Sequence, residues 1–182
     1  LQARLSVAVS PEDGTVVQYL SLKNLGGISD EVEVTGCFEA ALAARADMEA
    51  HPAFQKLFVE TMRPEPAVLG FKRRAREAGK RFPVMLYAVS GAERGALSVE
   101  TSREKLLGRN GSMTGGLEKD LSGSVGQTLD PCGALRVRVV MAPEEEIHLG
   151  FALGVVEEEE QIASWCRRYC TLEGDIRALQ LS

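Results

Sequence analysis

Apolar and polar residues alternate through most of the first third of the chain, the pattern of strands with one buried face. The alternation begins with Leu5, Val7 and Val9, and it returns over residues 15–23 and 30–42. Short turns rich in Pro, Asp, Asn and Gly separate the three runs. Three alternating runs joined by short turns predict an antiparallel meander.

The same alternation returns later in the chain. It predicts further strands over residues 57–62, 82–90, 95–100, 134–141 and 147–156. Residues 91–94 and 143–145 have the composition of turns, so each is predicted to close a hairpin between the strands beside it. The chain is therefore predicted to be mainly β, built as an antiparallel sandwich with a few helices.

Two shorter segments are predicted to be helical. Residues 67–79 follow a proline and end at a glycine, which are typical helix start and stop signals. Thr101 and Glu104 have the spacing of a capping box, which predicts a helical turn over residues 102–107 that ends at Gly108.

The strongest helix signal lies in residues 157–170. Apolar residues recur there on one helical face, at Ile162, Trp165, Cys166 and Tyr169. The stripe predicts a packing face, whose partner is either this chain or a further domain. We expect a β-sandwich domain over residues 1–156, followed by a C-terminal amphipathic helix and tail over residues 157–182.

Composition narrows the possible partners. The 182 residues carry a net charge of −5, which disfavours nucleic acid because phosphate binding needs a basic surface. No apolar run approaches the roughly 20 residues that span a bilayer. Because the sequence begins at Leu1 rather than Met, we expect a piece of a longer protein.

Cysteine and histidine give little sign of a metal site. The four cysteines match no zinc spacing and form no evident disulfide framework, so we expect no metal, no cofactor and a reducing, cytoplasmic compartment. Cys166 and Cys170 share a helical face, either as free packed thiols or as a metal or redox pair. His51 has no nucleophile or carboxylate at a motif spacing, which favours a hydrogen-bonded loop histidine over a catalytic one.

The polar stretch from Glu100 to Pro131 is the best candidate for a binding loop. It lies between predicted strands and is rich in Gly and Ser, and it carries Arg103, Arg109 and Asn110. It lacks the Gly-Lys-Ser/Thr ending of a nucleotide-binding loop. The two arginines either contact a ligand or pair with nearby carboxylates, namely Glu100 and Glu104. With no Ser-His-Asp pattern and no dinucleotide fingerprint, the sequence favours a binding or interface module over a self-sufficient enzyme.

The order of segments resembles the N-terminal β-sandwich domain of glycoside hydrolase family 94. This family holds the inverting glycoside phosphorylases and the phosphorylase-like part of cyclic β-1,2-glucan synthases. The similar segments keep the family's order and are residues 5–13, 32–35, 51–54, 57–61, 100–101, 103, 107–109, 126 and 129–131, whereas Ser102 stands where the family pattern would have an aspartate. Residues 51–61 are most similar to the β-1,2-glucan branch.

The resemblance implies a supersandwich similar to the galactose mutarotase fold. It implies a non-catalytic domain of a glycosyltransferase or phosphorylase, whose catalytic aspartate lies on a downstream (α/α)6 barrel and whose nucleophile is phosphate. The implied partners are that barrel, a β-glucan oligosaccharide and a second copy of the enzyme, and the parent could be a membrane-associated glucan synthase. Arg109 is the implied sugar contact, with Arg103 and Asn110 as neighbours, because a guanidinium offers fixed donors to hydroxyls or phosphate.

Two other functions remain open. One is a stand-alone carbohydrate-binding or assembly module, which the aromatic content of 5% disfavours because sugars usually stack on aromatic rings. The other is a mutarotase-like epimerase, which needs a histidine acid and a carboxylate base in one cleft, and only His51 and His148 could supply the acid.

Overall fold

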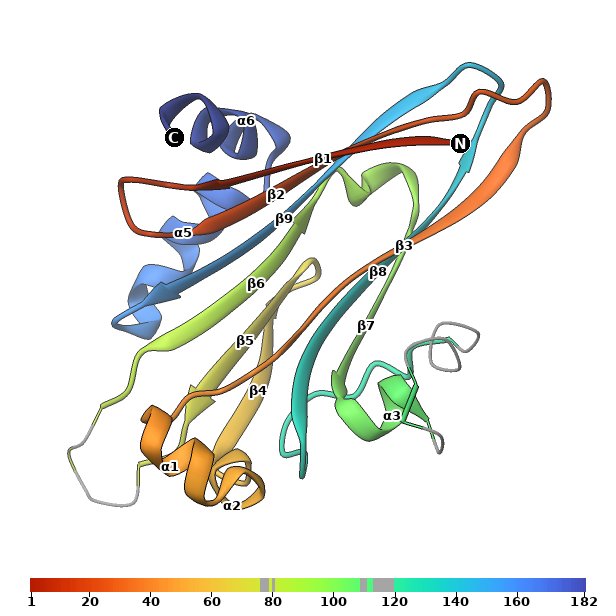
Figure 1. Cartoon of the computed structure of the whole chain (residues 1–182). Helices are drawn as coiled ribbons and strands as arrows, with labels where there is room; N and C mark the ends of the chain where they lie inside the picture. Colours follow the sequence, from red (N-terminus) through yellow and green to blue (C-terminus); the bar gives the residue numbers. More distant parts are fainter. Residues whose placement is uncertain (76–78, 80, 109–110, 113–119) are drawn as a thin grey trace.

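Two antiparallel sheets packed face to face form the chain, as the predicted β-sandwich requires (Figure 1). The computed structural model describes residues 1–75, 79, 81–108, 111–112 and 120–182. The six-stranded sheet has, in spatial order, β1 (Gln2–Val9), β2 (Val16–Lys23), β9 (Glu146–Val156), β6 (Val84–Ser90), β5 (Val68–Arg73) and β4 (Val59–Glu65). The three-stranded sheet has β3 (Asp30–Glu39), β8 (Pro131–Met141) and β7 (Ala96–Ser102).

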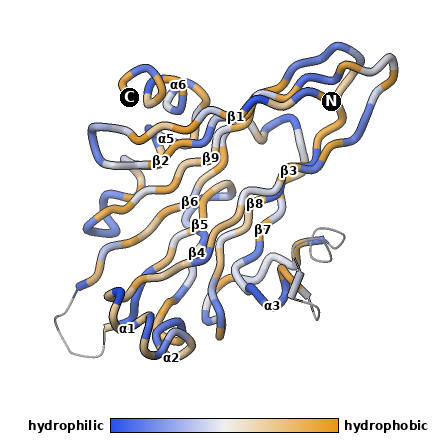
Figure 2. The backbone as a smooth tube through the Cα atoms, viewed as in Figure 1, coloured by the Kyte–Doolittle hydropathy of each residue, from blue (hydrophilic) through white to orange (hydrophobic). Residues whose placement is uncertain are grey.

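The main core lies between the two sheets, where Figure 2 shows apolar stretches on the facing strands. Aromatic rings fill its centre: Phe38 from β3 packs edge-on against Phe71 and Tyr87 from the six-stranded sheet. The sheets approach closely at Gly36, where an added Cβ would lie 2.2 Å from the Tyr87 hydroxyl oxygen. A glycine is therefore required at this point of β3.

Two helices cover the outer face of the six-stranded sheet (Figure 1). They are α5 (Ile162–Tyr169) and α6 (Leu172–Leu181), and the short turn η2 (Glu159–Gln161) precedes them. Trp165 and Tyr169 are buried against the sheet, which confirms the predicted apolar stripe and shows that its partner lies within this chain. The sequence interpretation treated residues 171–182 as a tail, although they contain α6.

The remaining helical segments are short. α1 (Arg45–Ala50) and α2 (Pro52–Lys56) connect β3 to β4, η1 (Ala92–Arg94) connects β6 to β7, and α3 (Arg103–Leu107) follows β7. α3 ends at Gly108, as predicted, but Ser102 is its N-cap and makes no side-chain capping bond. The predicted capping box between Thr101 and Glu104 is therefore wrong.

The predicted helix over residues 67–79 is also wrong, because β5 occupies Val68–Arg73. This strand lies between β4 and β6, and its first four residues are all buried. One face meets the helices and the other meets the second sheet, so the strand reads as a continuous apolar run without alternation.

The predicted neighbours of several strands are wrong as well. β3 does not complete a meander with β1 and β2 but pairs with β8 in the other sheet. Residues 91–94 and 143–145 carry the chain from one sheet to the other, so neither segment closes a hairpin. Among the described residues, no helix combines the length and apolar character needed to cross a membrane.

Candidate functional site

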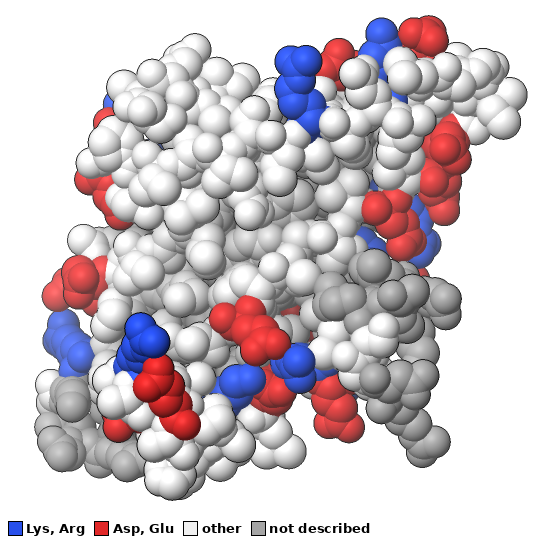
Figure 3. Space-filling view, in the orientation of Figure 1, with Lys and Arg blue, Asp and Glu red and all other residues white. Residues whose placement is uncertain are grey.

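Arg103 lies at the start of the predicted binding loop, within a network of four charged side chains. Its Nε donates to Glu39 Oε1 at 2.6 Å, and its Nη1 lies 3.6 Å from Asp130 Oδ2. Lys56 Nζ lies 2.6 Å from Asp130 Oδ1 and 3.6 Å from Glu39 Oε2. Figure 3 shows acidic and basic side chains gathered in the lower part of the face that is turned toward the viewer.

This network joins segments that are distant in sequence: α3, the end of β3, α2 and Asp130, the residue before β8. The hydrogen bond to Glu39, with the charges of Glu39 and Asp130, raises the pKa of Arg103 above its ordinary value. Arg103 therefore pairs with Glu39 and Asp130 rather than with the predicted Glu100 and Glu104. The other two predicted contact residues, Arg109 and Asn110, lie outside the described residues.

A buried carboxylate fixes the other end of the loop. Glu100 is 0% exposed and accepts four hydrogen bonds, from the backbone N–H groups of Thr101 and Ser102 and from the N–H and hydroxyl of Ser122. The bond from the Ser122 hydroxyl is 2.6 Å long. Glu100 thus ties the segment that returns from the loop to the end of β7.

Two threonines form a second tie next to Glu100. The hydroxyl oxygens of Thr61 and Thr101 lie 2.9 Å apart. Gly126 donates its N–H to Thr61 Oγ1 at 2.8 Å and accepts from the Thr61 N–H at 2.9 Å. The Thr101 hydroxyl donates to the Ser124 carbonyl at 2.8 Å. Residues 122–126 are therefore bound to β4 and β7, so the described flanks of the loop have a fixed geometry.

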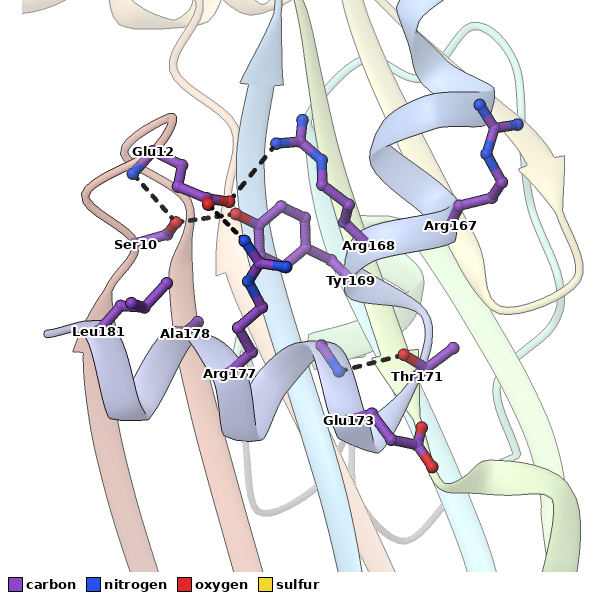
Figure 4. A pocket seen from close by; sticks show the side chains of 11 residues that line it. Ser10, Glu12, Arg167, Arg168, Tyr169, Thr171, Glu173, Arg177, Ala178 and Leu181 are labelled. Carbon is purple, nitrogen blue, oxygen red and sulfur yellow. Dashed lines mark hydrogen bonds and ion pairs between the residues drawn. The ribbon is translucent and has the colours of Figure 1, made fainter.

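A separate pocket of about 260 Å³ lies between the β1–β2 turn and the two covering helices (Figure 4). Arg177 Nη2 lies 2.7 Å from Glu12 Oε1, and Arg168 Nη2 lies 3.1 Å from Asp13 Oδ2. The Tyr169 hydroxyl, which Figure 4 shows at the pocket wall, donates to Asp13 Oδ1 at 2.8 Å. These guanidinium groups are satisfied by carboxylates of the chain itself, so the contacts hold the turn onto the helices.

The electrostatics of Asp13 agree with this structural role. Burial alone would raise the pKa of Asp13, but hydrogen bonds from Tyr169 and Thr15 and the charge of Arg168 lower it below its ordinary value. Arg168 lies in the last turn of α5. Its contact with the turn depends on the fold and has no local sequence signal.

The cysteines and histidines form no evident catalytic centre. All four cysteines are free thiols, and burial raises the pKa of both Cys166 and Cys170. His51 is exposed between α1 and α2, whereas His148 lies on β9 and stacks on Tyr19. The described part of the chain contains no group of three or more His, Cys, Asp or Glu side chains placed to hold a metal ion.

Comparison with known proteins agrees with this architecture. The family model described as glycosyl hydrolase 94, supersandwich domain, matches residues 1–172. The cyclic beta-(1,2)-glucan synthase NdvB of Rhizobium meliloti (strain 1021) is 30% identical over 151 residues, which cover 79% of this chain. The aligned part is 5% of the length of that protein, so the chain is similar to a small portion of it.

Proposed function

Because the chain belongs to the supersandwich domains of glycosyl hydrolase family 94, we propose that it is a non-catalytic domain of a larger glucan-processing enzyme. In this proposal the parent is a glycosyltransferase or phosphorylase acting on a β-1,2-glucan, as the name of its relative indicates. The domain packs against a catalytic (α/α)6 barrel of the same polypeptide and contributes to a homodimer. Its free thiols favour a reducing compartment, so we place it in the cytoplasm.

The observation that carries the proposal is the fixed base of the β7–β8 loop. Buried Glu100 holds one flank, and the charged network around Arg103 holds the other. Binding residues are most effective when rigid elements position them, because less conformational entropy is then lost on binding. We propose that the loop contacts the glucan through Arg109 and Asn110, with Arg103 as its anchor and neighbour.

An exposed apolar strip supports a packing role. Leu5, Val7 and Val9 project from one face of β1 and remain 59%, 58% and 54% exposed. Figure 3 shows mostly uncharged surface over β1 and β2. Contiguous apolar surface of this kind marks interaction sites in soluble proteins. A neighbouring domain of the parent enzyme is the partner that we propose for this strip.

The histidine positions favour a binding role over the epimerase reading. A mutarotase-like reaction needs an acid and a base on one sugar. His51 lies at the junction of two short helices, and His148 stacks on Tyr19 in the six-stranded sheet. His148 and Glu146 line one cavity, but among the described residues no hydrogen bond or ion pair joins a histidine to a carboxylate.

The test is an amide NMR titration of this chain with β-1,2-linked gluco-oligosaccharides and, separately, with cello-oligosaccharides. We expect saturable shifts around residues 103–108 and 120–126 with the β-1,2-linked series, and their loss in Arg109→Ala. The matched control is Arg45→Ala, which removes an exposed arginine of α1 whose ion pair is local to that helix. Equal shifts in Arg109→Ala, or no shift in this region at millimolar sugar, would contradict the proposed loop contact.

A further inference from the structure

A second group of polar side chains forms a regular array on the six-stranded sheet, on the face that α5 and α6 cover only in part. Antiparallel pairing aligns β1, β2 and β9 so that facing residues form rows across the sheet. The three rows are Gln2–Lys23–Glu146, Arg4–Ser21–His148 and Ser6–Tyr19–Gly150. Eight of these residues, with Leu179 of α6, line a cavity of about 570 Å³.

The dimensions suit a short oligosaccharide. Strands rise about 3.4 Å per residue and lie about 4.8 Å apart, so the array extends about 14 Å along β1 and about 10 Å across. The cavity volume falls within the range of about 300–1,000 Å³ that is usual for small-molecule sites. Two or three sugar units fit this length.

One end of the array has an aromatic surface. The rings of Tyr19 and His148 stack with centroids 5.5 Å apart and an interplanar angle of 21°. Aromatic rings carry negative charge on their faces, so they attract the weakly positive C–H groups on the flat face of a sugar ring. Tyr19 comes from β2 and His148 from β9, so the two rings meet only in the folded sheet. The low aromatic content of the sequence therefore gave no sign of this stacking surface.

Hydrogen-bonding groups surround the platform. Burial together with the charges of Asp175 and Glu146 raises the pKa of Tyr19, so its hydroxyl stays protonated and can donate. Arg4 and Ser6 line the same cavity with donors and acceptors suited to sugar hydroxyls. The Nδ1 atom of His148 is buried and has no hydrogen-bond partner.

A glycine and a buried carboxylate close the array toward the helices. An added Cβ on Gly150 would lie 1.7 Å from Asp175 Oδ2, so the carboxylate of α6 occupies the place of the missing side chain. Asp175 is 0% exposed, and its Oδ1 has no hydrogen-bond partner. Leu179, one helical turn further along α6, lines the same end of the cavity. The cavity is therefore bounded by α6, and of the two unpartnered buried atoms in the described part of the chain only Nδ1 of His148 belongs to a residue that lines it.

We propose that this array, named here the sheet groove, is a binding subsite for a neutral gluco-oligosaccharide of two or three units. The proposal rests on the proposed function for the choice of glucan, but it concerns different residues from the β7–β8 loop. Stacking on the outer face of the Tyr19–His148 pair fixes one sugar ring, and Arg4, Ser6 and Gln2 bind the hydroxyls of the next.

The charges of the groove favour a neutral ligand. Arg4 and Lys23 are balanced in part by Glu146, which accepts from the Ser21 hydroxyl at 2.5 Å. Lys23 also pairs with Glu144 at 3.5 Å. An anion would have to compete with these carboxylates, whereas sugar hydroxyls can donate to Glu146 and accept from Arg4.

The experiment is an NMR titration of the whole chain with β-1,2-linked glucotriose and with cellotriose, followed at residues 2–6, 19–23 and 146–150. We expect saturable shifts in these segments and at least a tenfold weaker affinity in Tyr19→Ala. Arg4→Ala, at an exposed position, provides the same test without removing a packed ring. The matched control is Gln18→Ala, an exposed neighbour of Tyr19 on the opposite face of β2, which should bind as the unchanged chain does.

The outcomes separate the two proposals. Shifts near residues 103–126 with none in the groove overturn the groove and leave the loop contact intact. Groove shifts that survive both Tyr19→Ala and Arg4→Ala also overturn it. Groove shifts that these variants weaken support the groove even if the loop shows no response, and no shift in either region overturns both.

Discussion

Asp175 is fully buried between α6 and the six-stranded sheet, and its replacement by asparagine should make stability less dependent on pH. Its Oδ2 accepts a hydrogen bond from the Ser90 hydroxyl, and its Oδ1 has no partner. Burial raises the pKa of Asp175 from 3.8 to about 6, although the Ser90 bond acts in the opposite direction. The charged form is therefore unfavourable in the folded protein.

The direction in which stability changes with pH follows from proton linkage. The folded state holds the Asp175 proton more tightly than the unfolded state, so raising the pH through this range costs folding free energy. The contribution of Asp175 is complete below the unfolded pKa of 3.8 and is lost as the pH rises through about 6. The difference between these two values corresponds to about 3 kcal/mol.

Asp175→Asn removes this loss because an amide does not titrate. Its NH2 group would lack a partner where Oδ1 lies now, at a cost of about 1–3 kcal/mol that does not depend on pH. The decisive quantity is therefore the change with pH in the stability difference between the two proteins. We expect that difference to shift by about 2.5 kcal/mol in favour of the variant between pH 4 and pH 7, because most of the contribution is present at pH 4 and almost none at pH 7.

Urea unfolding followed by the fluorescence of Trp165, the single tryptophan, measures this difference. Trp165 is 1% exposed, so unfolding changes its surroundings completely. The nearby groups Tyr19 and Cys170 have pKa values raised by burial, so neither titrates between pH 4 and pH 7. Parallel pH profiles for the chain and for Asp175→Asn would refute the argument.

Two further predictions concern residues whose side chains are tightly constrained by their neighbours in the fold. Glu100→Ala leaves the N–H of the buried Thr101 without its acceptor and removes three further hydrogen bonds, so urea unfolding should show a loss of about 3 kcal/mol, against about 1 kcal/mol or less for Glu39→Ala in its partly exposed ion pair; equal losses would contradict the buried clamp. Gly36→Ala places a Cβ against Tyr87 and should lower the thermal midpoint by an amount that corresponds to about 2 kcal/mol. Gly27→Ala, with nothing within 4 Å of its Cβ, should leave that midpoint nearly unchanged, and similar shifts in the two variants would contradict the close approach of the sheets.

The strands were predictable because most have one buried face and therefore a clear period of two. β8 keeps this alternation through Val137 and Val139, which are buried, whereas in β1 the alternating residues Leu5, Val7 and Val9 remain exposed, so the expectation of a buried apolar face there is wrong. β5 was missed because it is buried on both sides, so no polar residue marks its period. α6 was missed although Thr171 caps it and Glu173 and Asp175 stand in its first turn, a combination that indicates a helix start.

Strand neighbours could not be predicted, because a short turn does not fix whether the chain stays in one sheet. Residues 91–94 and 143–145 have turn composition, yet both cross between the sheets. The same limit applied to Arg103, whose partners are Glu39 at the end of β3 and Asp130 just before β8. The sequence placed a polar loop here correctly, but the groups that hold it depend on the pairing of β3 with β8.

This pairing also separates the two proposed glucan contacts. The β7–β8 loop leaves the three-stranded sheet, whereas the sheet groove lies on the six-stranded sheet, on the face turned away from the three-stranded one. The core around Phe71, Tyr87 and Phe151 fills the space between them, so a trisaccharide cannot reach both. A longer glucan could contact both only by passing around the sandwich. Binding at one region is therefore free of steric competition from the other, and each set of variants reports on its own site.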